Sequence, residues 1–424
     1  MKLLKTKWLE FLAWVLRGRA RKVLKEHKPL VIGVTGSVGK STTKEAIYSV
    51  LKYKFPVLRN EGNFNNEIGV PLTIIRQEKP EGVGEWLKFI IFGNSFVKIQ
   101  NDYPSYLVLE LAADKAGDIG YLCNLVEPTI GVVTNIGDSH LEFFGNKKKT
   151  TIEKRALIES LPREGRAILN FDDERVLGMA KFTKAKVVTY GLKKGAQISA
   201  INILVDNNGT LFKLVYEGSV IPVRIKMIGY SFVRAALAAT AVGVAVGMDL
   251  VDIIQALQTW EPLAGRMRII EGKNKMTIVD DSYNASLDSV INAIESMKLM
   301  KVAGRKVAVL GSMWELGKMT KKDHIEAGKR AGRFFDLLVC VEEFGDIIKQ
   351  GAIKVGMKEE NILVYDSTDL LLKDIDQIFL SGDTVLVKGS QSKNRLEKLI
   401  KEIMKDSTLA EKILVRQSKE WQNK

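Results

Sequence analysis

One stretch of the chain decides the fold: Leu30-Val31-Ile32-Gly33-Val34, followed directly by Thr35-Gly36-Ser37-Val38-Gly39-Lys40-Ser41-Thr42. The apolar run predicts a buried strand, and the glycines predict a loop that leads into a helix at Lys40. Backbone N–H groups of such a loop approach phosphate oxygens, and the dipole of the following helix favours the negative charge. We therefore interpret residues 35–42 as a nucleotide phosphate loop, with Lys40 at the β- and γ-phosphates and Ser41 as a ligand of Mg²⁺.

The loop is shorter than the most common phosphate-loop pattern, which would place a glycine where this chain has Val34. The remaining pattern, G-[ST]-x-G-K-[ST], also arises by chance in a chain rich in glycine and lysine. The expected strand before the loop and the helix after it are therefore what support the nucleotide site.

Beyond the loop, short apolar runs alternate with helical stretches, which is typical of a mostly parallel sheet covered by helices. The runs expected to form its buried strands are Leu30–Val34, Leu107–Leu111, Ile130–Thr134, Ala167–Leu169 and Val187–Tyr190. Residues 195–228 alternate around Asp206-Asn207-Asn208-Gly209 and predict an antiparallel hairpin at the edge of this sheet.

A second series of strands and helices begins after the turn at residues 261–265. Its expected strands are Thr277–Asp280, Lys306–Leu310, Leu337–Val341, Asn361–Tyr365 and Thr384–Val387. The sequence thus predicts an α/β protein, with a P-loop-type, mostly parallel central sheet domain and a Rossmann-like C-terminal domain. We expect these domains to cover residues 29–268 and 269–424, after a helix at residues 1–28. The polar tail after about residue 405 is expected to fray.

The composition is that of a globular protein, with 424 residues, 46% hydrophobic and 27% charged. The two cysteines, Cys123 and Cys340, lack metal-ligand spacing and indicate reduced thiols in a cytosolic protein. Three histidines in all exclude a histidine-rich metal site. The net charge of +14 favours anionic partners such as nucleotides, phosphorylated substrates or a membrane surface. No aromatic and basic recognition motif supports nucleic acid as a partner.

Residues 1–28 hold half of the charge excess, because nine lysines and arginines there stand against two glutamates. Trp8, Phe11, Leu12 and Val15 recur at helical spacing and predict a basic amphipathic helix. Its uncharged run, residues 11–16, is far shorter than the roughly 20 residues that span a bilayer. Such a helix either lies on an anionic membrane or packs against its own protein or a partner, and the sequence leaves both open.

Acidic and histidine side chains follow two of the expected strands. Glu110 ends one buried run, Asp114 and Asp118 come shortly after it, and His140 follows the next run. Ligands gather at the carboxyl ends of strands in open α/β sheets, so Glu110 and His140 would lie beside the phosphate loop. An ordinary strand-end glutamate and a polar loop histidine remain the alternative.

Further motifs carry a specific resemblance. They are Gly62–Pro71, Thr134–Gly145, Leu169–Asp173, Gly265–Met267, Asp280–Ala285, Leu310–Gly317 and Val387–Ser390. Together with residues 36–42 they resemble the Mur ligases of peptidoglycan synthesis, in the right order from residue 30 to about residue 400. Within that family, the likeness is greatest to the members that add D-alanyl-D-alanine.

The resemblance implies an ATP-dependent amide ligase that adds D-Ala-D-Ala to a UDP-muramoyl-tripeptide through an acyl phosphate, in the cytoplasm. It implies catalytic and metal roles for Lys40, Ser41, Glu110, His140 and Lys154, with two Mg²⁺ ions and a carbamoyl group on Lys154. The nucleotide-binding residues that it implies, besides the phosphate loop, are Asn66, Arg266, Asp281, Tyr283 and Asn284. If residues 1–28 contact a membrane, the enzyme would work at its inner face. The oligomeric state stays open.

Three departures from the family pattern concern substrates more than catalysis. The separate UDP-binding domain that usually precedes the phosphate loop is expected to be absent, because only a helix fits before Lys40. The family's helix start G-x-H-N-x-x-N reads Gly229-Tyr230-Ser231-Phe232-Val233-Arg234-Ala235, and Ser312 replaces an aspartate. Two other functions therefore stay open: a Mur-type ligase with another acceptor, such as a polyglutamate or cofactor ligase, and an NTP-driven switch without ligase activity.

Overall fold

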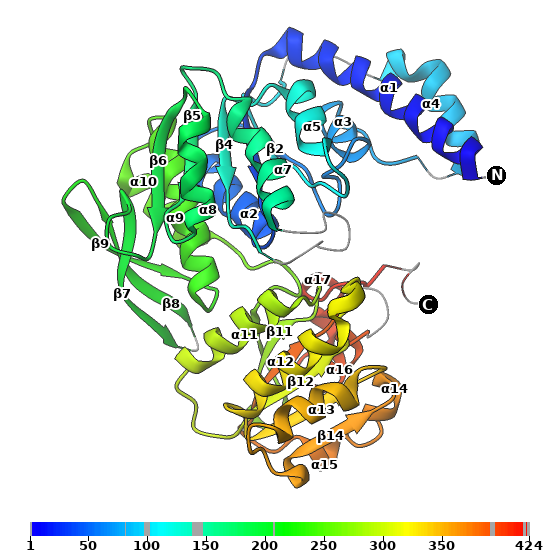
Figure 1. The fold of residues 1–424 in the computed structure, drawn as a ribbon, viewed down its shortest axis with the longest axis vertical. Helices are drawn as coiled ribbons and strands as arrows, with labels where there is room; N and C mark the ends of the chain where they lie inside the picture. Colours follow the sequence, from blue (N-terminus) through cyan, green and yellow to red (C-terminus); the bar gives the residue numbers. More distant parts are fainter. Residues whose placement is uncertain are drawn as a thin grey trace.

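The computed structural model describes residues 2–80, 82–96, 102–137, 147–206, 208–390, 395–418 and 421. Two sheets organise the chain, and Figure 1 shows them as an upper and a lower part. The upper part extends to α10 (Leu250–Thr259), and the lower part begins at β10 (Arg268–Glu271). The predicted α/β fold, with a large, mostly parallel sheet and a second sheet, is confirmed.

The first sheet has nine strands, parallel from β2 to β7 and antiparallel from β7 to β9. Its order is β2 (Val57–Arg59), β3 (Tyr106–Glu110), β1 (Leu30–Thr35), β4 (Ile130–Val133), β5 (Arg166–Asn170), β6 (Lys186–Gly191), β7 (Ile198–Asp206), β8 (Gly209–Tyr216) and β9 (Ser219–Ile225). The central position of β1 places the phosphate loop between the ends of β3 and β4, because all three strands run the same way.

Alternate residues of the central strands enter two separate cores, as strand geometry requires. Ile32 and Val108 pack with the helices α2 (Lys40–Lys52), α9 (Tyr230–Ala245) and α10 on one face. Val31 and Leu107 pack on the other face, where the helices are α1 (Lys2–His27), α3 (Gly69–Ile74), α5 (Asp118–Val126) and α7 (Lys147–Glu159). Both faces are thus covered, which explains why these strands are apolar throughout.

The second sheet has six strands, all parallel except the edge strand β10. Its order is β10, β11 (Thr277–Asp281), β15 (Thr384–Lys388), β12 (Lys306–Gly311), β13 (Leu337–Val341) and β14 (Ile362–Tyr365). The helices α11 (Leu287–Leu299), α12 (Thr320–Gly332) and α13 (Gly345–Ile353) cover one face, and α14 (Thr368–Leu371), α16 (Glu397–Ile403) and α17 (Ala410–Ile413) cover the other. The carboxyl ends of β11 and β15 carry Asp281 and Lys388.

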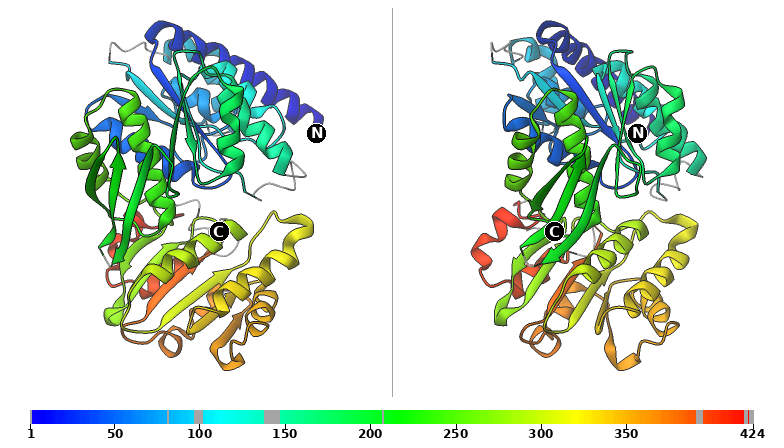
Figure 2. Two further views of the ribbon diagram at one scale, coloured as in Figure 1. Left: turned by 60° about the vertical axis from the view of Figure 1, so that its left-hand side comes forward. Right: turned by 90° about the vertical axis from the view of Figure 1, so that its left-hand side faces the viewer.

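Helix α1 is an integral part of the core that contains Val31 and Leu107. Leu12, Leu16 and Ala20 are buried against α3 and α5, and Arg19 donates hydrogen bonds to two carbonyl oxygens of α4 (Gly82–Phe96). Figure 2 shows α1 along the outside of the upper part. None of the described helices combines the length and the apolar character that crossing a bilayer requires.

The strands expected from the sequence are all present, with ends within one residue of the prediction. The predicted hairpin is β7 and β8, and β9 extends it. The short strands β2 and β10 were missed. The expectation of a fraying tail was wrong as far as Arg416, because Ala410 and Leu414 are buried and Arg416 pairs with Glu397. The division of the chain at residues 28 and 268 stays a prediction.

The packing of α1 predicts unequal effects for two substitutions on it. Leu16→Ala should lower the free energy of unfolding by about 2–5 kcal/mol, because it leaves a cavity in the core. Trp14→Ala should change it by less than about 0.5 kcal/mol, because that side chain is 71% exposed. Urea unfolding followed by circular dichroism measures both. Equal effects would show that α1 is not part of the core.

Candidate active site

The phosphate loop depends on two glycines that no other residue can replace without strain. Gly36 has φ 146°, and a Cβ added there would lie 1.9 Å from Thr134 Oγ1. Gly39 has φ 83° and is the N-cap of α2, in the left-handed region that favours glycine. The loop therefore turns tightly between β1 and the N-terminus of α2, where the helix dipole attracts phosphate.

The end of β4 holds the loop in shape. Ser37 N donates to Asn135 O at 2.9 Å, and Val38 N donates to Asn135 Oδ1 at 2.8 Å. Thr134 Oγ1 in turn donates to Val38 O at 2.7 Å. On the other side, Thr35 Oγ1 donates to Leu111 O at 2.8 Å. The strands flanking β1 thus brace the loop before any nucleotide binds.

Lys40 lies at the centre of a group of charged side chains. Its Nζ donates to Ser37 O at 3.2 Å. Burial lowers the pKa of Lys40, Glu110 raises it, and Arg266 lowers it again. Arg266 lies between α10 and β10, in the segment that joins the two parts of the molecule, so this segment also contributes charge at Lys40. A polyphosphate placed here would meet Lys40 and Arg266 together.

Glu110 has the features of a metal ligand. Its side chain is 3% exposed, and Oε1 accepts a hydrogen bond from Asn65 Nδ2 at 3.0 Å. Oε2 is buried without a hydrogen-bond partner among the described residues. An unsatisfied buried carboxylate oxygen is costly unless something binds it, and a cation would do so.

Asn60 fixes the position of Glu110. Its Oδ1 accepts from Glu110 N at 2.9 Å, and its Nδ2 donates to Glu110 O at 2.9 Å and to Phe64 O at 2.8 Å. Lys44 of α2 donates to Asn60 O. Asn60 is 1% exposed and joins the helix of the phosphate loop to the end of β3. This link was missed at the sequence level, although Asn60 directly follows a strand.

Lys154 is a buried amine close to Lys40. It is 3% exposed, and burial together with the charge of Lys40 lowers its pKa to about 7. Asp114, Asp118 and Glu153 act in the opposite direction. Below about pH 7, the charged form of Lys154 lowers the stability of the folded protein by its full amount. This penalty decreases as the pH rises from about 7 to the unfolded pKa of 10.5.

An aromatic and cationic pair lies where the joining segment meets the lower part of the molecule. The guanidinium of Arg266 lies over the ring of Tyr283, 4.2 Å from its centroid. Tyr283 Oη donates to Asn63 Oδ1 at 2.7 Å, which joins the two parts of the molecule. Arg416 Nη2 donates to Tyr283 O at 2.7 Å and supports this loop from behind.

Asp281 and Asn284 lie deeper in the lower part. Asp281, 8% exposed, accepts a hydrogen bond from the buried Lys388. Lys388 also donates to Asn284 O at 3.0 Å, and Ser390 Oγ donates to Asn284 Oδ1 at 3.4 Å. The Asp281 carboxylate is thus held by a lysine here, and its role in nucleotide binding stays a prediction.

The structure brings most of the predicted residues together. Lys40, Glu110, Lys154 and Arg266 form one electrostatic group. Asn66 lies just before α3, and its Oδ1 accepts from the N–H groups of residues 68 and 69. His140 lies outside the described residues. The roles predicted for all of these side chains stay predictions.

The family model described as "Mur ligase middle domain" matches residues 34–243, and "Mur ligase, glutamate ligase domain" matches residues 265–391. The UDP-N-acetylmuramoyl-tripeptide–D-alanyl-D-alanine ligase of Bacillus subtilis is 30% identical over 92% of this chain and 79% of its own length. The chain belongs to the Mur ligase family.

Other relatives agree with this assignment. The ligase of the same name from Mycobacterium tuberculosis is 31% identical over 72% of this chain. The matched region covers 56% of the length of that ligase. The MurF ligase of Thermotoga maritima, solved in complex with ADP, has a TM-score of 0.77 and 28% identity, over 94% of this chain and 84% of that one. A MurF structure from Acinetobacter baumannii has a TM-score of 0.78 and 25% identity, over 92% and 80%. The family resemblance seen in the sequence is confirmed.

The hydrogen bonds of Asn60 predict an effect on metal use. Asn60→Ala should raise the Mg²⁺ concentration for half-maximal ATP-dependent phosphate release by about 10-fold, because Glu110 loses its support. Excess Mg²⁺ should restore most of the rate. Thr240→Ala is the control: Thr240 is equally buried, but its hydroxyl bonds to Ala236 O one turn back in α9. A Mg²⁺ dependence that moves equally in both variants would contradict the role of Asn60.

Proposed function

We propose that this Mur ligase joins D-alanyl-D-alanine to UDP-N-acetylmuramoyl-tripeptide, with conversion of ATP to ADP and phosphate. One observation supports the chemistry above all: Lys40, Glu110 and Arg266 interact at the phosphate loop, with a buried Lys154 beside them. The substrates are inferred from the relatives of that name, which this chain resembles over most of its length.

The reaction has two steps. A substrate carboxylate oxygen attacks the γ-phosphorus of ATP, the bond to ADP breaks, and an acyl phosphate forms. The amine of the dipeptide then attacks the acyl carbon, the bond to phosphate breaks, and the amine loses a proton to give the amide. Lys40 and Arg266 would neutralise charge on the transferring phosphoryl group, and electrostatic stabilisation of this kind is usually the largest single term in catalysis.

Two Mg²⁺ ions are proposed to bind at this site, with Ser41, Glu110, His140 and Lys154 as the residues that would hold them. The buried, unsatisfied Oε2 of Glu110 supports this. Among the described residues, no three His, Cys, Asp or Glu side chains gather closely enough to hold an ion, so hydroxyl and phosphate oxygens would complete the set. When bound, Mg²⁺ polarises phosphoryl oxygens and screens their charge.

Lys154 is proposed to carry a carbamoyl group. Only a neutral amine reacts with CO₂, and a pKa of about 7 leaves much of Lys154 neutral near physiological pH. The nitrogen of the neutral amine forms a bond to the carbon of CO₂ and releases a proton, which turns an uncharged side chain into an anion next to Lys40. The carbamate and the Lys40 cation would then form an attractive pair.

The nucleotide is proposed to lie between the two parts of the molecule. Its phosphates would bind residues 35–42, and the residues proposed to line the rest of its site are Asn66, Arg266, Asp281, Tyr283 and Asn284. The contact between Tyr283 and Asn63 supports a site that both parts share.

The enzyme is further proposed to work in the cytoplasm, with residues 1–28 in peripheral contact with the inner face of a membrane. The excess of nine basic over two acidic residues in this stretch supports contact with an anionic surface.

The reaction predicts phosphate release only when ATP, D-Ala-D-Ala and UDP-N-acetylmuramoyl-tripeptide are all present. Lys40→Ala should lower that rate at least about 100-fold, because a charge that stabilises the transferring phosphoryl group is lost. Lys52→Ala removes an exposed lysine from the same helix and should leave the rate unchanged. Full turnover by Lys40→Ala would refute the ligase mechanism, and turnover with another acceptor alone would refute the proposed substrate.

The carbamate predicts chemical rescue. Lys154→Ala should lower the rate about 10–100-fold, since a support of the metal site is lost. Added acetate or propionate should restore part of it, because a small carboxylate can occupy the space of the carbamate. Lys40→Ala should not respond to either acid. Absence of rescue at every acid concentration, or full activity of Lys154→Ala without acid, would refute the carbamate.

A further inference from the structure

Helix α1 has an outer face that the fold does not use. This outer face consists of side chains that recur every three or four residues and are all exposed: Lys7, Glu10, Phe11, Trp14, Gly18, Arg21, Lys22 and Lys25. Trp14 is 71% exposed and Phe11 is 43% exposed. Two large aromatic side chains in water are unfavourable for the isolated protein, and they stack on each other with ring centroids 6.3 Å apart.

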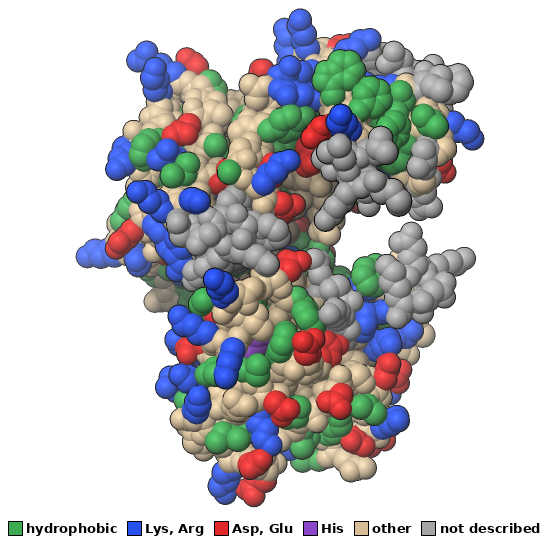
Figure 3. All heavy atoms as spheres, turned by 45° about the vertical axis from the view of Figure 1, so that its right-hand side comes forward, with side chains coloured by type: hydrophobic (Ala, Val, Ile, Leu, Met, Phe, Trp, Pro, Cys, Tyr) green, Lys and Arg blue, Asp and Glu red, His purple; other side chains and the backbone are tan. Residues whose placement is uncertain are grey.

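Packing within the chain does not account for these aromatic residues. The opposite face of α1 already supplies Leu12, Leu16 and Ala20 to the core. Figure 3 shows hydrophobic side chains gathered next to lysine and arginine on the upper part of the molecule, which α1 borders. Aromatic residues flanked by basic ones are typical of a helix that lies in a membrane interface.

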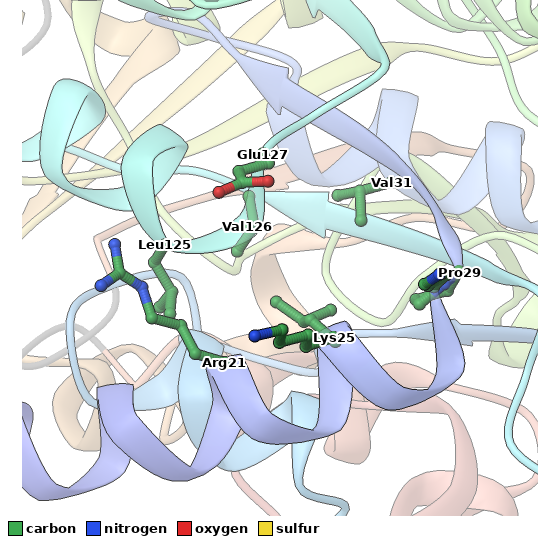
Figure 4. Close-up of a pocket in the computed structure, with 9 residues that line it drawn as sticks. Arg21, Lys25, Pro29, Val31, Leu125, Val126 and Glu127 are labelled. Atoms are coloured by element: carbon green, nitrogen blue, oxygen red, sulfur yellow. The ribbon is translucent and has the colours of Figure 1, made fainter.

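The basic end of the same face borders a cavity of about 640 Å³. Arg21 and Lys25 of α1 line it together with Lys28, which directly follows α1, and Glu127 lies across from them, as Figure 4 shows for Arg21, Lys25 and Glu127. The apolar part of the lining comes from Leu24, Pro29, Val31, Leu125 and Val126. Three cations against one carboxylate make the cavity suitable for a phosphate group.

Asn124 holds part of this basic surface in place. Its Oδ1 accepts from Arg21 Nη2 at 2.7 Å and from Arg17 Nη2, and its backbone oxygen accepts from Arg21 at 3.1 Å. Arg21 is thereby oriented at low entropic cost to any ligand. The C-terminal dipole of α1 alone would favour cations in the last turn, but Arg21 lies well before that turn and the dipole explains neither the cavity nor Trp14.

We propose that the outer face of α1 docks on an anionic phospholipid bilayer, with Phe11 and Trp14 among the lipid headgroups and acyl ends. Arg21, Lys25 and Lys28 contact lipid phosphates, and the cavity receives one headgroup. This inference rests on the proposed peripheral contact of residues 1–28 and is independent of the ligase chemistry. Opposite charge favours a bilayer over a protein partner here, because each Lys or Arg near an anionic surface adds about 1 kcal/mol.

Docking in this way leaves the active site accessible. The cavity lies where β1 begins, at Pro29 and Val31, whereas the phosphate loop follows its other end. Five residues of strand separate the two by about 16 Å. Soluble substrates could therefore reach the loop while α1 is on the bilayer.

Vesicle co-sedimentation of the full-length chain tests the proposal. Vesicles of phosphatidylcholine that contain about 30% phosphatidylglycerol should bind the chain at least about 10-fold more tightly than vesicles of pure phosphatidylcholine. Phe11→Ser/Trp14→Ser and, separately, Lys25→Gln/Lys28→Gln should each weaken binding about 10-fold or more. Deleting α1 is a poor test, because its inner face belongs to the core.

Two controls match these variants. Leu204→Ser/Val251→Ser removes apolar side chains that are 65% and 62% exposed away from α1, and Lys354→Gln/Lys401→Gln removes the same charge from exposed positions of the lower part. Both should bind like the unmodified chain. Phosphate release by every variant, measured without vesicles, reports on folding and on the ligase reaction independently of membrane binding.

Three results would overturn the proposal: no binding of the unmodified chain to the anionic vesicles, equal losses in test and control variants, or self-association through Phe11 and Trp14 in analytical ultracentrifugation without vesicle binding. The last result would identify the outer face as a contact between copies of this chain. Loss of phosphate release by the unmodified chain would refute the ligase proposal alone.

Discussion

The parallel pairing of β1 with β3 on one side and β4 on the other is the constraint on which the site depends. Its register sets Val34 opposite Glu110 and Thr35 opposite Val133. Three strand ends therefore converge, and each contributes something different: the phosphate loop, a buried carboxylate and the braces of the loop. A shift of one residue in the pairing of β1 with β3 would turn the Glu110 side chain to the other face of the sheet.

The convergence of these strands concentrates charge where water is scarce. Lys40, Glu110 and Lys154 are each costly to bury alone, and burial lowers the pKa values of both lysines. Without ligands, the buried charges are only partly satisfied by neighbouring groups. Glu110 keeps an unsatisfied oxygen, and Lys154 loses much of its charge because its pKa is lowered. Such a site gains from binding both a polyphosphate and cations, which is what a phosphoryl-transfer enzyme requires.

Much of this could be predicted from the sequence, because the signals are local. Apolar runs located the strands within one residue, and the glycines located the loop. Asn60 could not be found in this way, since its bonds join residues 50 positions apart in sequence. Tyr283 and Asn63, separated by 220 positions, are a stronger case. Which side chains meet across two sheets follows from tertiary packing, and a single sequence carries no periodic signal for it.

Helix α1 shows the same limit from another side. Its sequence allowed packing on the protein and contact with a membrane as two alternatives. The structure separates them by face, because Leu12 and Leu16 are buried while Trp14 points outward. The residues between these faces, Arg17 and Arg19, extend along the protein to Asn124 and to α4. One helix can therefore belong to the core and still present an aromatic and basic surface, at the opposite end of β1 from the phosphate loop. The direction of that strand thus sets how far the surface of α1 is from the chemistry.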